Sequence, residues 1–94
     1  MRRVADENNV LIEYVREDNT PIGVVVAIDR DRIGFSKKNP KDQWNKNLGK
    51  KIAIGRARSK ELSVKDILEL PEKDIPLFQE KIQKIYDRAQ RYYK

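Results

Sequence analysis

The sequence predicts an α+β fold: a three-stranded antiparallel β-meander followed by a basic helix, a short helix and a long C-terminal amphipathic helix. Three observations lead to this prediction. The first third of the 94-residue chain contains closely spaced apolar runs rich in β-branched residues, which are typical of strands. The rest of the chain contains helix starts marked by capping residues. The last third also repeats its apolar residues at alternating spacings of three and four, as an amphipathic helix does.

Three apolar runs predict the strands. Residues 10–16, VLIEYVR, form the first strand, in which Glu13 interrupts an otherwise apolar sequence. Residues 22–28, IGVVVAI, are apolar on both faces and should form the central strand. Gly23 within this run indicates a bulge or a close backbone contact. Residues 33–36 form the third strand, and strands so close in sequence pair as a meander.

Polar segments precede and separate the strands. Residues 17–21, EDNTP, and residues 29–32, DRDR, have the composition of tight turns. Residues 1–9 are polar, and we expect them to be flexible.

The clearest helix start lies in the basic middle segment. Asn39 can cap the helix, Pro40 occupies its first position and Asp42 places a carboxylate in its first turn. We expect this helix to end near Arg58.

The same segment predicts how the helix packs. Trp44, Leu48 and Ile52 recur every four residues, so they share a stripe that we expect to press on the sheet. Gly49 and Gly55 each weaken the helix by about 1 kcal/mol relative to Ala. We expect one of them to permit close contact between helix and sheet; Gly55 lies almost in line with the stripe.

Two more helices follow. Ser63 opens the short helix in a capping box whose third position is Asp66, and Pro71 stops it. The last helix begins near Asp74, with Pro76 in its first turn. We expect its apolar side to pack on the core, although the same pattern also suits a homodimer through this helix. That side consists of Ile75, Phe78, Ile82, Ile85, Ala89 and Tyr92.

The composition limits what this chain can be. A chain of 94 residues allows one compact domain, which we expect to span residues 1–94. Without Cys or His, it has no disulfide, no cysteine metal site and no histidine base. No apolar run is long enough to cross a membrane, and the N-terminus lacks the apolar region of a signal peptide. We expect a soluble protein of the cytoplasm that makes no membrane contact.

The positive charge is concentrated in the middle of the chain. Residues 30–60 carry eleven basic and two acidic side chains, whereas residues 1–29 carry three basic and six acidic ones. The remaining residues carry seven of each, so the formal net charge of +6 comes from the middle third. Such a segment attracts polyanions, either nucleic acid or the acidic surface of a protein.

Catalysis is poorly supported by the sequence. Asp29 and Asp31 could contribute oxygen ligands to a Mg²⁺ site, with Glu13 as a further carboxylate. Aspartates in a turn beside arginines more commonly make local hydrogen bonds, so we expect no metal and no cofactor. The serines have no histidine to activate them, and the glycines match no nucleotide-binding pattern. We expect a protein that is not an enzyme.

Nucleic-acid binding is better supported, because many cations lie on one short segment. We expect electrostatic binding with little sequence specificity, since no known nucleic-acid-binding motif is present. The alternative is a protein-binding inhibitor whose basic face occupies an acidic or nucleic-acid-binding partner. Trp44 is expected in the core rather than as a stacking platform. The candidate interface residues are Lys37, Lys38, Lys41, Lys46, Lys50, Lys51, Arg56 and Arg58.

One segment resembles a family. The run IGFSKKNPKDQWNKNLGKKIAIGRA, residues 33–57, is similar to a segment of short bacteriophage and prophage accessory proteins. There, a strand ending in IG and an aromatic leads into NPKD, a second aromatic, LG and IAxGRA. The resemblance implies a protein made in the bacterial cytoplasm during infection. Such proteins often bind nucleic-acid machinery or block a host defence such as CRISPR, and the resemblance implies no catalytic residues.

Overall fold

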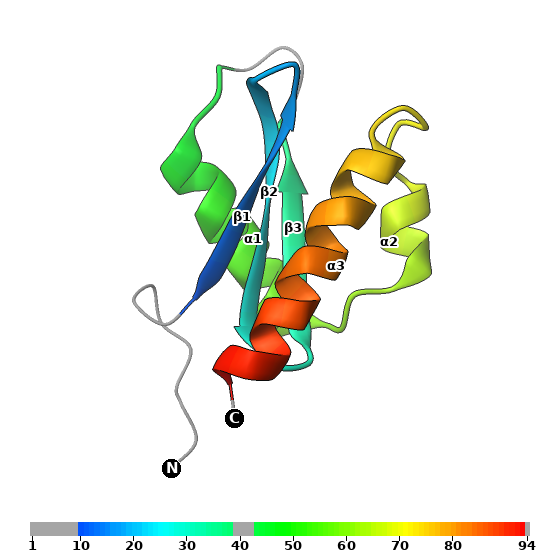
Figure 1. Ribbon diagram of the computed structural model, residues 1–94. Helices are drawn as coiled ribbons and strands as arrows, with labels where there is room; N and C mark the ends of the chain where they lie inside the picture. Colours follow the sequence, from blue (N-terminus) through cyan, green and yellow to red (C-terminus); the bar gives the residue numbers. More distant parts are fainter. Residues whose placement is uncertain (1–9, 39–42, 94) are drawn as a thin grey trace.

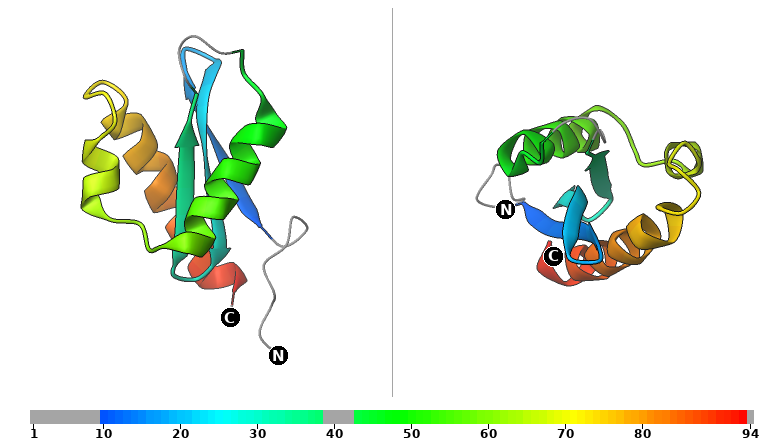
Figure 2. Two further views of the ribbon diagram at one scale, coloured as in Figure 1. Left: turned by 180° about the vertical axis from the view of Figure 1, so that it is seen from behind. Right: turned by 90° about the horizontal axis from the view of Figure 1, so that it is seen from above.

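The fold has three layers, with one helix on each face of the sheet. The computed structural model describes residues 10–38 and 43–93. Helix α1 covers one face of the sheet, α3 covers the other, and α2 lies beside α3 (Figures 1 and 2). The order of elements confirms the predicted α+β fold. The elements are β1 (Leu11–Glu17), β2 (Thr20–Asp29), β3 (Arg32–Lys37), α1 (Lys46–Ser59), α2 (Val64–Leu68) and α3 (Ile75–Tyr92).

The sheet is the predicted meander, with strand order β1-β2-β3 and antiparallel pairing throughout. Asp18 and Asn19 connect β1 to β2 with φ values of 50° and 69°, a conformation that Asn and Asp tolerate better than most residues. The register shifts next to Gly23, where a Cβ atom would lie 2.4 Å from the Phe78 ring. Both parts of the Gly23 prediction are therefore confirmed: a bulge beside it and a close contact.

The central strand supplies a core on both faces of the sheet. Val25 and Ala27 face α3, in a cluster that includes Phe78 and Ile85. Val24 and Val26 face the opposite way, in a smaller cluster with Ala53 and Ala57 of α1. All of these side chains are fully buried. The run that is apolar on both faces was correctly predicted as the central strand.

Helix α1 begins later than the sequence predicted. Its N-cap is Asn45, whose side-chain oxygen accepts the N–H of Leu48 at 3.0 Å. The predicted cap and first turn, Asn39, Pro40 and Asp42, lie outside the described residues. Residues 43–45 are described and are not helical, so Asn45 starts the helix.

The predicted packing stripe is wrong for Leu48 and Ile52 but right for Trp44, which lies just before α1 and packs, partly buried, against the smaller core cluster. Leu48 is 54% exposed and Ile52 is 40% exposed, so neither presses on the sheet. The buried side of α1 consists of Ala53, Ile54 and Ala57. Spacing alone could not distinguish the two stripes, because both recur at intervals of three to four residues.

A glycine on the neighbouring strand explains which side of α1 faces the sheet. A Cβ atom on Gly34 of β3 would lie 2.3 Å from the carbonyl oxygen of Ala53 and 2.6 Å from the amide nitrogen of Ala57. The backbone of α1 therefore lies directly against β3, and only small side chains fit between them. Gly49 also faces the sheet, whereas a Cβ on Gly55 would meet no other described atom within 4 Å. The prediction that one of the two glycines permits close contact with the sheet is confirmed for Gly49, while Gly55 shares the outward side of Leu48.

The two C-terminal helices begin as predicted. The capping box of Ser63 and Asp66 is present, with both reciprocal hydrogen bonds. Helix α3 buries Phe78, Ile85 and Ala89 against the sheet.

The end of α3 departs from the predicted spacing. Tyr92 is 39% exposed, and the buried aromatic is Tyr93, whose hydroxyl donates to the carbonyl of Ala27 at 2.8 Å. The chain leaves the helix at Tyr93, which brings that ring to the sheet. A homodimer through α3 stays a prediction.

The contrast between Gly34 and Gly55 gives a stability test. We expect Gly34→Ala to destabilise the fold by about 1–3 kcal/mol or more, because its methyl group would push α1 off the sheet. We expect Gly55→Ala to stabilise it by about 1 kcal/mol, because Ala favours the helix and meets no neighbour. Urea unfolding of the two variants measures both effects. Equal stability of the two variants would contradict the described packing of α1.

Candidate nucleic-acid interface

The two outer layers of the sandwich differ in charge. Residues 43–60, which contain α1, carry six basic side chains and no acidic one. Residues 61–93, which contain α2 and α3, carry six basic and seven acidic side chains. Helices α1 and α3 cover opposite faces of the sheet (Figure 2). Because residues 43–60 contain no acidic side chain, the positive charge of α1 is not neutralised within its own layer.

Besides Arg56, four of the candidate residues lie on α1 outside its buried side. Lys46 lies over the ring of Tyr14, with its Nζ atom 5.2 Å from the ring centre. Lys50 is half-buried, and Lys51 and Arg58 are exposed. The sequence prediction is therefore consistent with the placement of these four cations.

Two other candidates, the exposed Arg56 and the half-buried Lys37, contact other groups of the protein. Arg56 donates from Nη1 to the carbonyl oxygen of Phe35 at 3.0 Å. The Nζ atom of Lys37 lies 3.6 Å from a carboxylate oxygen of Asp74, whose side chain is only 4% exposed. Both cations have a structural task, so we expect them to contribute less to binding than the four on α1.

Of the remaining two candidates, only Lys38 lies among the described residues. Lys38 follows β3, and its backbone N–H donates to the carbonyl of Ile22 at 2.8 Å. Lys41 lies outside the described residues.

A second group of cations, which the sequence did not predict, lies on α3. Lys81, Lys84 and Arg88 surround Glu13 of β1, with N···O distances of 3.9, 3.6 and 2.5 Å. The Glu13 side chain is only 13% exposed, so this carboxylate is held between sheet and helix. The signal was a single acid within an apolar strand, which needs a partner when buried. The cations of α3 did not stand out in the sequence, because residues 61–94 carry equal numbers of basic and acidic side chains and their net charge is zero.

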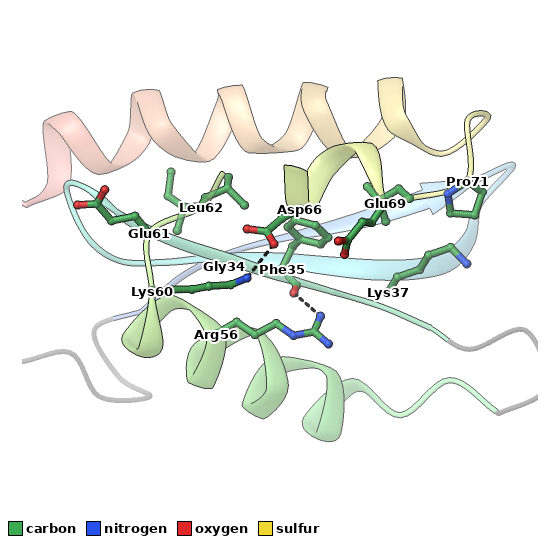
Figure 3. Close-up of a pocket in the computed structure, with 12 residues that line it drawn as sticks. Gly34, Phe35, Lys37, Arg56, Lys60, Glu61, Leu62, Asp66, Glu69 and Pro71 are labelled. Atoms are coloured by element: carbon green, nitrogen blue, oxygen red, sulfur yellow. Dashed lines mark hydrogen bonds and ion pairs between the residues drawn. The ribbon is translucent and has the colours of Figure 1, made fainter. Parts of the chain in front are cut away.

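A groove of about 380 Å³ lies along β3, between α1 and α2 (Figure 3). Arg56 reaches into it from α1, and Lys60 bonds Asp66 of α2 at 2.8 Å. The hydrogen bond from Lys60, followed by those from the backbone N–H and the hydroxyl of Ser63, lowers the pKa of Asp66 from 3.8 to about 2. Asp66 therefore serves both the capping box and the wall of the groove.

One of the two turn aspartates makes a local hydrogen bond. Asp29 accepts the backbone N–H of Arg30 at 2.7 Å. Within residues 10–38 and 43–93, no three acidic side chains gather closely enough to hold a metal ion. No helix in these ranges is long and apolar enough to cross a membrane.

Comparisons with protein-family models, curated proteins and solved structures found no match for this chain. The resemblance of residues 33–57 to phage accessory proteins therefore stays a prediction. Several residues of that segment have a structural explanation, since Gly34, Ala53 and Ala57 form the contact between β3 and α1.

The capping box gives a pH prediction. The pKa of Asp66 is lower in the folded protein than its ordinary value, so its carboxylate stabilises the fold above about pH 4. This contribution is lost as the pH falls toward 2. We expect Asp66→Asn to lower the melting temperature at pH 7 and to have little effect near pH 2. Thermal melts across this range measure the difference.

Glu72→Gln is the matched control for that test, because it removes an exposed carboxylate outside the capping box. A pH dependence of Asp66→Asn identical to that of Glu72→Gln would show that the capping box does not hold Asp66 ionised.

Proposed function

We propose that this protein binds nucleic acid electrostatically through the α1 layer, without catalysis. The observation that carries the proposal is the charge difference between the layers: Lys46, Lys50, Lys51 and Arg58 lie on α1 outside its buried side, and residues 43–60 contain no acidic side chain. A surface of one sign attracts the phosphate backbone over the whole length of the helix. By its resemblance to phage proteins, we place this activity in the cytoplasm of an infected bacterium.

The outward line of α1 suits a polyanion. Lys51, Gly55 and Arg58 follow one another at spacings of four and three, so they share one side of the helix. Lys51 and Arg58 are about 10 Å apart along the axis at 1.5 Å per residue. Gly55 between them carries no side chain, and the space that a Cβ atom would face there is open, which leaves room for a backbone to approach.

A second function is a protein-binding inhibitor of a nucleic-acid-handling or defence system. The groove along β3 favours it, because nucleic-acid binding through α1 leaves this groove unused. Leu62, Leu70 and Pro71 line the groove beside an edge strand, a combination that can receive a segment of another protein. In this alternative the basic face attracts an acidic partner and nucleic acid does not bind.

Charge reversal tests the proposed function. We expect Lys46→Glu combined with Lys50→Glu to weaken binding to duplex DNA and to lower the log–log salt slope by about 1.8, or 0.9 for each lost phosphate contact. The melting temperature should change little, because a carboxylate in the first turn of α1 offsets the lost contact of Lys46 with Tyr14. Fluorescence anisotropy at several salt concentrations measures both quantities.

The control is Lys65→Glu combined with Lys73→Glu, which changes the net charge equally but on the other layer. Both lysines are exposed. We expect this variant to keep most of the affinity and the full salt slope. Equal losses in the two variants would mean that net charge, and not the α1 face, governs binding.

A further inference from the structure

The basic layer contains an apolar hollow that the core does not use. Leu48 and Ile52 are 54% and 40% exposed, although both are large aliphatic residues on a helix that carries five cations. Beside them lies a hollow of about 200 Å³, which Trp44 also lines. The other described residues around it are Ser36, Lys37, Lys38, Gln43, Asn45 and Gly49.

Packing of the sandwich does not explain this apolar surface. The buried side of α1 consists of Ala53, Ile54 and Ala57, each at most 7% exposed. Neither the Leu48 nor the Ile52 side chain belongs to a core cluster. Exposed apolar surface within a charged surface is typical of a binding site.

The surroundings of the hollow define the chemistry of its ligand. Among the described residues that line it, none is acidic, and Lys37 and Lys38 lie at the end of β3 on one side. A suitable ligand therefore has an apolar, flat part and carries its negative charge outside that part. An acidic peptide fits less well, because its charge lies at the tip of the side chain and would enter the apolar hollow. A nucleotide fits, because its base is flat and its phosphate is separate.

We infer that the nucleic acid bound by the α1 face is single-stranded, and that one of its bases occupies the hollow of Trp44, Leu48 and Ile52. This inference rests on the proposed function and adds the class of nucleic acid. A duplex keeps its bases stacked inside, so only a single strand can offer a base to an aromatic and aliphatic surface. Phosphates on either side of the base then lie over Lys38 and Lys51.

The test compares two exposed apolar pairs of equal spacing. Leu48→Gln with Ile52→Gln removes the proposed base site, and Val64→Gln with Leu68→Gln removes a pair on α2 that is 71% and 65% exposed. Each variant and the unmodified protein are titrated with labelled oligothymidylate of about 15 nucleotides and with a duplex of the same length. None of the four side chains belongs to a buried cluster, so all the proteins should fold.

We expect the unmodified protein to bind the single strand more tightly than the duplex. The Leu48 and Ile52 variant should lose about tenfold or more in affinity for the single strand, as expected when base stacking is removed. Its affinity for the duplex, and both affinities of the α2 variant, should stay unchanged. Trp44 is the single Trp of the chain, so its intrinsic fluorescence should be quenched by oligothymidylate and not by the duplex.

The remaining outcomes separate the two proposals. Equal affinity for single strand and duplex, with no loss in the Leu48 and Ile52 variant, would overturn the base site and leave electrostatic binding standing. If neither oligonucleotide binds at about 50 mM salt, both proposals are overturned. Binding of polyglutamate under those conditions would then assign the face to an acidic protein.

Discussion

The contact of α1 with Gly34 determines the rest of this structure. Because the carbonyl of Ala53 and the amide of Ala57 lie where a Cβ of residue 34 would be, the helix axis is held close to β3. This contact also fixes the rotation of the helix. The side with Ala53, Ile54 and Ala57 must face inward, so the side with Leu48, Lys51, Gly55 and Arg58 must face outward. The composition of the outer face is therefore a consequence of how the inner face packs.

An arginine binds one backbone carbonyl at each edge of the sheet. Arg56 of α1 donates to the carbonyl of Phe35 on edge strand β3, and Arg88 of α3 donates to the carbonyl of Ile12 on edge strand β1, at 3.0 and 3.3 Å. Edge strands present unpaired backbone groups that can pair with other chains, and such contacts occupy them. A cation in a basic segment can thus belong to the fold, which is why counting charges overestimates an interface.

The two helical layers differ in how they pack on the sheet and in the charge they carry. Helix α3 covers the larger core, and three of its cations pair with Glu13 of β1. Helix α1 covers the smaller core with Ala and Ile side chains and has no acidic residue. Because α1 packs through small residues, its long side chains remain outside the core, and these are the ones that the proposed binding uses.

The sequence by itself determined the meander, the central strand, the capping box at Ser63 and the start of the long helix near Asp74. These features depend on local periodicity, turn chemistry and capping, which act between residues near in sequence. Only the tertiary structure decided which side of α1 is buried, that Tyr93 rather than Tyr92 enters the core, and that Lys37 and Arg56 are engaged. Each depends on an atom distant in sequence: a missing Cβ at Gly34, the carbonyl of Ala27, the carboxylate of Asp74 and the carbonyl of Phe35. No periodicity encodes such contacts, because they arise only when the layers come together.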